Sequence, residues 1–231
     1  MDQIQLKRQA GEYAANHFVE SGMVVGLGHG STAIWAVRRI AELIKSGALT
    51  DIIAIPCSHE IELDAREWGI PLTDFAHHPV IDVTIDGADE VDPNLQLIKG
   101  GGGALLQEKI VAQASKREII IVDESKLSPA LATKFVLPVE VFQFGWRSVV
   151  ARLEALGAQW TLRTNGNGTP FETDQKNYIL DCKFAPIEDP RKLDVALLRL
   201  AAVAEHGLFI DIATDVIVAR EGGIEHLTAN R

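Results

Sequence analysis

The sequence predicts an α/β protein in which a doubly wound, Rossmann-like parallel sheet carries most of the chain and is joined to a second, smaller α+β domain. Two observations predict this class. Up to about residue 130, short apolar segments alternate with longer amphipathic segments, which is typical of a parallel sheet covered by helices on both faces. Beyond that point the expected order becomes strand, helix, strand, strand, helix, strand, which is the split βαβ arrangement.

The first domain is expected to begin with an amphipathic helix over residues 4–20, followed by a short buried strand. Ser31 stands at the expected N-cap of the next helix, and Gly47 lies near its end. That strand is expected over residues 23–28 and that helix over 31–47. The elements after them are expected, in order, as strand 52–56, helix 59–69, strand 80–89, strand-like 95–99, helix 104–116 and strand 118–123.

The second region has its own series of elements. They are expected as strand 135–141, helix 146–157, strand 159–164, turn 165–170, strand 178–184, helix 190–206 and strand 207–213. We therefore expect a smaller α+β domain (split βαβ, ferredoxin-like) over 131–206, inserted into a Rossmann-like domain of residues 1–130 plus 207–231 that carries the active site. The apolar segment 215–220 is expected to return to the first sheet.

Composition limits the classes of function. The chain has 231 residues, 47% of them hydrophobic and 23% charged, which is the balance of an ordinary globular protein with a sizeable core. The net charge of -10 argues against nucleic acid as a partner, because nucleic acid selects basic surfaces. An anion would have to be bound by a local group of hydrogen-bond donors.

Cysteine usage and hydropathy add further expectations. Cys57 and Cys182 have neither CxxC nor metal-ligand spacing, so no disulfide framework can be inferred and no metal is expected. No apolar run reaches membrane-spanning length, and the N-terminal segment is polar and does not resemble a signal peptide. The expected location is the cytoplasm, with no membrane partner.

Three polar loops follow expected strands at their carboxyl ends, where open α/β sheets bind ligands. The first loop, residues 26–32, reads Gly-Leu-Gly-His-Gly-Ser-Thr. Its glycines let the backbone approach a ligand closely, while Ser31 and Thr32 offer N–H groups and hydroxyls at a helix N-terminus, where anions bind. The alternative is a tight turn with Ser31 as an ordinary N-cap. The spacing matches neither common nucleotide-binding pattern.

The second loop contains Asp86 and Asp89, which bracket a Gly-Ala pair at the end of an expected strand. A single aspartate in such a place often caps a turn. Two carboxylates three residues apart at a strand end offer a second possibility, which is to hold the hydroxyls of a sugar.

The third loop is a run of four glycines, residues 100–103, with Lys99 before it and Glu108 in the early part of the helix after it. Consecutive glycine N–H groups can form an anion-binding nest. A glutamate near a helix N-terminus is favoured electrostatically without any further role, so Glu108 alone indicates little. The glycines favour a functional role, because they would let a substrate lie against bare backbone between Lys99 and Glu108.

Taken together and in this order, the three loops resemble those of the type A family of ribose-5-phosphate isomerases. Residues 26–33 are similar to its phosphate loop, and residues 85–92 and 97–112 are similar to its two sugar loops. Segments 123–126, 134–141 and 207–218 also fit. The resemblance covers nearly the whole chain, including the inserted α+β domain.

This resemblance implies an aldose-ketose isomerase that interconverts ribose 5-phosphate and ribulose 5-phosphate through an enediolate, in the non-oxidative pentose phosphate pathway. It implies that Glu108 is the base and that Lys99, Asp86 and Asp89 are the other catalytic residues. The substrate-binding positions that it implies are His29, Gly30, Ser31, Thr32, Asp86, Gly87, Ala88, Asp89, Lys99, Gly100, Gly101, Gly102, Lys126 and Lys7. It implies no cofactor and no metal, and a homodimer or possibly a tetramer.

The chain departs from the family pattern at two positions. The family has Thr, or sometimes Ser, where this sequence has His29, so an imidazole replaces a hydroxyl donor. Thr is also commoner at the position of Cys57. These differences bear on substrate affinity and substrate identity, while the residues assigned to the chemistry are intact.

Two other functions remain open from the sequence. One is a related sugar-phosphate isomerase with a different substrate, such as an amino-sugar phosphate isomerase that releases ammonia, although its expected His-containing triad is absent after the acidic loop. The other is a non-catalytic sugar-phosphate sensor domain. Such sensors usually carry a helix-turn-helix segment, and they can lose the base that Glu108 would supply.

Overall fold

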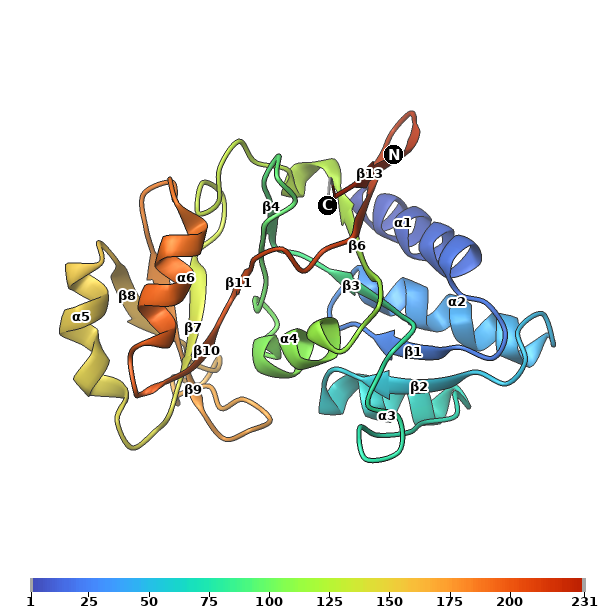
Figure 1. Ribbon diagram of the computed structural model, residues 1–231, viewed down its shortest axis with the longest axis horizontal. Coiled ribbons are helices and arrows are strands. Elements are labelled where there is room, and N and C mark those ends of the chain that lie inside the picture. The colour runs from blue at the N-terminus through green and yellow to red at the C-terminus, as the bar shows by residue number, and fades with distance from the viewer. Residues whose placement is uncertain (1, 230–231) are drawn as a thin grey trace. The chain divides into compact units, whose positions relative to one another are not determined.

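The computed structural model describes residues 2–229, and the chain divides into two compact units (Figure 1). Unit 1 contains the residues up to Ala88, Gln107–Lys126 and the chain from Ile212 onward. Unit 2 contains Asp89–Leu106 and Leu127–Asp211. This division differs from the expected domain ends, because the segment after Ala88 pairs through two short strands with residues 208–209 of unit 2.

Unit 1 is built on a six-stranded sheet. Its strands are β1 (Val24–Leu27), β2 (Ile53–Pro56), β3 (Val83–Gly87), β6 (Glu118–Asp123), β12 (Asp215–Arg220) and β13 (Gly223–Thr228). They are arranged β13-β12-β6-β3-β1-β2, and all pairs are parallel except β12 with β13. The parallel strands, numbered along the chain, therefore follow the doubly wound order 2-1-3-4-5. The expected return of segment 215–220 is confirmed, and the edge strand β13 was not expected.

Helices cover both faces of this sheet. They are α1 (Gln3–Phe18), α2 (Ala33–Lys45), α3 (His59–Glu67) and α4 (Leu105–Gln113). Buried side chains of α1, α2 and α3 pack with alternate strand residues in one apolar cluster. Val111 of α4 packs with Ile55, Cys57 and Ile81 in another. Because both faces are covered, β6 is buried along its whole length, and the predicted fold class is confirmed.

Unit 2 contains a four-stranded antiparallel sheet. Its strands are β7 (Leu137–Val141), β8 (Gln159–Leu162), β9 (Tyr178–Lys183) and β10 (Val203–His206), in the order β10-β7-β9-β8. The 3-10 turn η2 (Trp146–Val149) leads into helix α5 (Val150–Ala155), and α6 (Pro190–Leu198) connects β9 with β10. The spatial order 4-1-3-2 with two crossover helices is the predicted split βαβ arrangement.

The C-terminal part of unit 2 differs from the sequence expectation. The predicted helix 190–206 was too long, because α6 ends at Leu198 and the last four residues form strand β10. Pairing of Val203 with Val141 and of His206 with Val139 overrides the helical preference of the alanine-rich segment before it. The strand predicted over 207–213 is limited to β11 (Leu208–Phe209).

Strand β11 belongs to a small three-stranded sheet of unit 2. It pairs with β5 (Leu97–Ile98), and β5 pairs with β4 (Glu90–Val91). This sheet carries the chain that leads into the glycine run. None of the helices in the described part of the chain is long and apolar enough to cross a lipid bilayer.

Candidate active site

The first two predicted loops leave neighbouring strands of the unit 1 sheet. Strand β1 ends at Leu27 and strand β3 ends at Gly87, and these two strands pair directly. They form the point at which the 2-1-3-4-5 order reverses, where doubly wound sheets bind their ligands. The predicted phosphate loop and the first predicted sugar loop therefore start at the expected edge of the sheet.

Asp86 connects these two loops. Its Oδ1 accepts the backbone N–H of His29 at 3.0 Å and that of Gly87 at 2.7 Å. A Cβ at position 28 would lie 2.4 Å from the same oxygen, so only glycine allows this close approach. Asp86 is 1% exposed, and part of its acceptor capacity is used to shape the predicted phosphate loop.

The imidazole of His29 has a defined orientation. Its Nδ1 lies 3.0 Å from the Oγ of Ser58, a buried residue. Ser58 is the N-cap of α3 and accepts the backbone N–H of Ile61 at 3.2 Å. Sequence reasoning missed Ser58 as a neighbour of the loop. Its signal was only that of an N-cap, a serine directly before a helix with an acidic first turn.

Lys7 and Ser31 are brought together in unit 1. The Nζ of Lys7, from α1, donates to the Oγ of Ser31 at 2.9 Å. The predicted N-cap was wrong by one residue, because α2 starts at Ala33 with Thr32 as its N-cap and with no side-chain capping bond. A lysine and two hydroxyl side chains thus lie at the start of α2, where the helix N-terminus adds N–H donors for an anion.

Two further predicted residues lie in unit 1. Lys126 ends the 3-10 turn η1 (Glu124–Lys126), which follows the carboxyl end of β6, the neighbour of β3. Glu108 lies in the first turn of α4 and is only 5% exposed. Burying an ionisable carboxyl group costs free energy, and a glutamate can stabilise a helix N-terminus while it remains exposed to solvent. The burial of Glu108 therefore favours a functional role over helix stabilisation alone.

Unit 2 contains Lys99, the glycine run and Asp89. Lys99 is 2% exposed, its N–H donates to the carbonyl oxygen of Gly207 at 2.9 Å, and its Nζ lies 5.4 Å from the ring centroid of Phe209. Gly100 and Gly103 have φ values of +99° and +87°, which side-chain-bearing residues rarely adopt. The backbone turns therefore explain two of the four glycines.

The close approach of Asp89 explains why a third position, residue 101, is a glycine. Its Oδ2 accepts the Gly101 N–H at 2.7 Å, and a Cβ on Gly101 would lie 2.7 Å from its Oδ1. The Gly101 N–H is therefore bonded to Asp89 and does not belong to the anion-binding nest that consecutive glycine N–H groups can form. Sequence reasoning also missed Arg163, which contacts the carbonyl groups of the glycine run.

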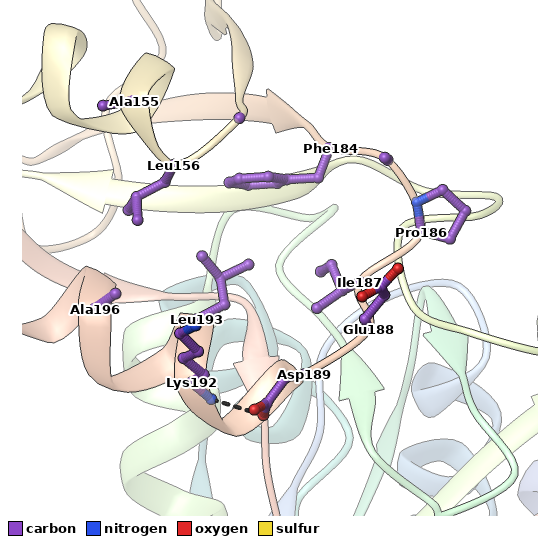
Figure 2. Close-up of a pocket in the computed structure, with 12 residues that line it drawn as sticks. Ala155, Leu156, Phe184, Pro186, Ile187, Glu188, Asp189, Lys192, Leu193 and Ala196 are labelled. Atoms are coloured by element: carbon purple, nitrogen blue, oxygen red, sulfur yellow. Dashed lines mark hydrogen bonds between the residues drawn. The ribbon is translucent and has the colours of Figure 1, made fainter.

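A separate pocket of about 430 Å³ lies in unit 2 (Figure 2). Its walls come from the end of α5, the loop after β9 and the start of α6, and none of the predicted site residues lines it. Phe184, Ile187 and Leu193 are apolar core side chains, and Asp189 is the N-cap that accepts the Lys192 N–H at 3.0 Å. The pocket is thus an opening at the edge of the unit 2 core.

The described residues also bear on metal binding. Among residues 2–229, no group of three or more His, Cys, Asp or Glu side chains is arranged to hold a metal ion. Two carboxylates of the predicted site, those of Asp86 and Asp89, accept backbone N–H groups. Each unit thus carries a buried ionisable side chain suited to the chemistry, Glu108 in unit 1 and Lys99 in unit 2.

Relatives with known names match almost the whole chain. A family model described as Ribose 5-phosphate isomerase A (phosphoriboisomerase A) matches residues 53–223. The chain is 57% identical to the ribose-5-phosphate isomerase A of Desulfatibacillum aliphaticivorans, with 97% of each chain covered. It is 55% identical to that of Chloroflexus aurantiacus, with 94% of this chain and 91% of the relative covered.

Solved structures agree with the sequence relatives. Ribose 5-phosphate isomerase from Plasmodium falciparum is 40% identical with a TM-score of 0.95, covering 99% of this chain and 100% of that chain. A D-ribose-5-phosphate isomerase in complex with phospho-erythronic acid is 39% identical with a TM-score of 0.96 and the same coverage. With the fold, the loops and these relatives in agreement, the chain belongs to the ribose 5-phosphate isomerase A family.

Proposed function

We propose that this protein interconverts ribose 5-phosphate and ribulose 5-phosphate through an enediolate. The observation that carries the proposal is the match to named ribose-5-phosphate isomerases A over 97% of both chains at 57% identity. The relative with phospho-erythronic acid bound adds a ligand of the same class, a phosphorylated sugar acid. The reaction belongs to the non-oxidative branch of the pentose phosphate pathway.

Glu108 is the proposed base. In the aldose-to-ketose direction its carboxylate removes the proton from C2, and the electron pair of the C–H bond forms the C1=C2 double bond of the enediolate. Glu108 then returns a proton to C1, while the O2 proton is lost and O1 is protonated, so the substrate and product are isomers. Its place in the first turn of α4 and its burial support this role.

Lys99 is the proposed cation at the reacting oxygens. The negative charge of the enediolate develops on the oxygens of C1 and C2, and a buried ammonium stabilises it more strongly than an exposed one would. The 2% exposure of Lys99 supports this assignment. Asp86 and Asp89 are proposed to position the sugar hydroxyls, and one of them to assist opening of the furanose ring.

The phosphate is proposed to bind at the start of α2. The hydrogen bond between Lys7 and Ser31, the hydroxyl of Thr32 and the helix N-terminus support this assignment. Lys126 is a further proposed cation. The remaining proposed substrate-binding positions are His29, Gly30, Gly87, Ala88, Gly100, Gly101 and Gly102. Binding energy from the phosphate fixes the reacting carbons without taking part in bond changes.

A substrate panel tests the proposed function. The purified protein is incubated with ribose 5-phosphate, with other pentose and hexose phosphates and with glucosamine 6-phosphate, and ketose formation and ammonia release are measured. We expect rapid ketose formation from ribose 5-phosphate alone. Ammonia release would identify an amino-sugar phosphate isomerase, and binding of ribose 5-phosphate without turnover would identify a sensor domain.

We also propose a homodimer, with a tetramer as the alternative, and a cytoplasmic location. Large apolar side chains of unit 2 that are exposed in the single chain support self-association, since exposed apolar surface of this kind often marks an interface. They are Phe142, Phe144, Leu156, Val195 and Leu198. Light scattering after gel filtration measures the oligomeric state, and a monomer would contradict this part of the proposal.

A further inference from the structure

Arg163 lies against the carbonyl side of the glycine run. It directly follows β8 in unit 2 and is 63 residues from Gly100 in the sequence. Its Nη1 donates to the carbonyl oxygen of Gly100 at 2.9 Å and to that of Gly101 at 3.2 Å. A single guanidinium nitrogen thus contacts two successive peptide groups of a segment in which no side chain restricts the backbone.

Arg163 is itself fixed by its neighbours. Its Nε and Nη2 donate to the two carboxylate oxygens of Asp181 at 3.0 and 2.5 Å, a bidentate pair. Its backbone N–H donates to the carbonyl oxygen of Ile179 at 2.9 Å, and its side chain is 14% exposed. The guanidinium also lies 5.9 Å from the ring centroid of Phe171, whose ring would be only 2.5 Å from a Cβ on Gly103.

These contacts, together with the backbone hydrogen bond that the Gly103 N–H donates to the Gly100 carbonyl oxygen at 3.0 Å, determine which way the peptide groups of the run point. A peptide group is planar and trans, so its N–H points away from the side to which its carbonyl oxygen points. The Gly100 carbonyl faces Arg163, and the N–H of the same peptide group, that of Gly101, donates to Asp89 at 2.7 Å. By the same geometry, the contact of Arg163 with the Gly101 carbonyl directs the Gly102 N–H away from Arg163.

We propose that Arg163 is a positioning residue of the isomerase. It turns the Gly100 and Gly101 carbonyls away from the substrate, holds Asp89 through the Gly101 N–H, and leaves the Gly102 N–H as a donor to a substrate oxygen. This inference rests on the proposed function. A carbonyl oxygen turned toward an enediolate would raise the energy of the transition state, whereas an N–H donor lowers it.

Steady-state kinetics of Arg163→Lys are the first part of the test. Lysine keeps the charge but lacks the planar fork that contacts Asp181 and both carbonyls at once. We expect kcat to fall about 10- to 100-fold with a smaller change in KM, because misplaced groups act mainly on the transition state. Asp181→Asn, which loosens the guanidinium without removing it, should act in the same direction and more weakly.

Asn165→Ala is the matched control. The side-chain amide of Asn165 donates to Thr169 Oγ1 at 3.1 Å and to the Pro170 carbonyl at 3.2 Å, within the same turn after β8. This substitution loosens the turn without touching the glycine run. If it lowers kcat as much as Arg163→Lys does, the effect is general loosening of unit 2 and the proposal is wrong.

Amide exchange at Gly101, followed by NMR, is the second part of the test. We expect Arg163→Lys to speed exchange at least about tenfold and Asn165→Ala to leave it unchanged, because only the former frees the peptide group bonded to Asp89. Unchanged exchange together with kcat within about twofold of wild type would overturn the proposal. If Arg163→Lys does not fold, Asp181→Asn is subjected to both measurements.

The exchange readout also separates this proposal from the proposed function. A wild-type protein without isomerase activity would contradict the proposed function, and Gly101 exchange would still decide whether Arg163 orients the run. An active wild type with an unaffected Arg163→Lys variant would contradict only the positioning role.

Discussion

Glu108 is the residue on which the proposed chemistry depends most. Glu108→Gln keeps the shape of the side chain and removes its basicity, so kcat should fall by at least about 100-fold while KM changes little. The measurement is steady-state kinetics in both reaction directions, with circular dichroism to show that the variant is folded. Turnover near the wild-type value would mean that another group moves the proton.

His29 lies in the predicted phosphate loop, at the position where the family resemblance led us to expect a threonine or serine. Its ring is held by Ser58, and its backbone by Asp86. We expect His29→Ala to raise KM about fivefold, because the substitution removes the hydrogen bond between His29 and Ser58 that holds the ring in the loop. A neutral hydrogen bond of this kind contributes about 1 kcal/mol. The value of kcat should stay near wild type, because the phosphate is remote from the carbons that react.

His29→Thr is the matched variant for this prediction. Threonine supplies a hydroxyl donor at the same position, so KM should return toward the wild-type value. A large fall in kcat with unchanged KM in either variant would instead place His29 near the proton transfer, and the proposed orientation of the substrate would be wrong.

At the scale of elements, the glycine run depends on close packing against Asp89. Gly101→Ala would place a Cβ 2.7 Å from the Asp89 carboxylate, in a loop whose backbone cannot move without breaking the Gly101–Asp89 hydrogen bond. We expect a folded protein whose kcat/KM is about 10- to 100-fold lower. Gly166→Ala is the control, since a Cβ there meets no atom within 4 Å. Equal kinetics for the two variants would contradict a role for this packing.

Most elements could be predicted from the sequence because their patterns are local. The apolar segments of β1, β2, β3 and β6 have helices on both sides in the chain, and the loops after β1 and β3 fall at the expected edge of the sheet. Strand β10 was missed because its residues continue an alanine-rich helical pattern, and only pairing with β7 makes them a strand. Strand β13 follows a Gly222-Gly223 pair, a hairpin signal that could have been used.

Contacts between residues distant in the sequence could not be predicted. Arg163 and Gly100 are 63 residues apart, and no local pattern marks an arginine after a strand as a ligand of backbone carbonyls. The same holds for Ser58 beside His29, whose sequence signal was that of an N-cap alone. The loops themselves were recognisable, while the side chains that hold them in place were not.

At the scale of whole-protein stability, Asp215 ties together several parts of unit 1. It accepts hydrogen bonds from Arg117 at 3.0 Å, from His226 at 2.7 Å and from Thr214 at 2.6 Å. Burial is the largest influence on the pKa of Asp215 and raises it, but the bonds from Thr214, His226 and Arg117 together outweigh burial and leave the pKa below its ordinary value. The ionised form therefore stabilises the folded protein.

Asp215→Asn should lower the free energy of unfolding at pH 7 by about 1.5–3 kcal/mol, the range for hydrogen bonds to a charged group. Because the pKa of Asp215 is lower in the folded state, this stabilisation is complete above the unfolded value of about 3.9 and is lost as pH falls through the folded pKa. Urea unfolding of both proteins from pH 7 down to pH 3 measures it. A difference that grows toward acid would contradict this account.

The most direct test of the central claim is deuterium incorporation. The protein is incubated with ribose 5-phosphate in D₂O until the isomers have interconverted many times, and the products are examined by NMR. Proton transfer by Glu108 through an enediolate predicts deuterium at C1 of ribulose 5-phosphate and at C2 of ribose 5-phosphate, because the protonated carboxyl group exchanges with solvent between turnovers. Ketose that forms but carries no deuterium after repeated interconversion would contradict the account, as would the absence of ketose.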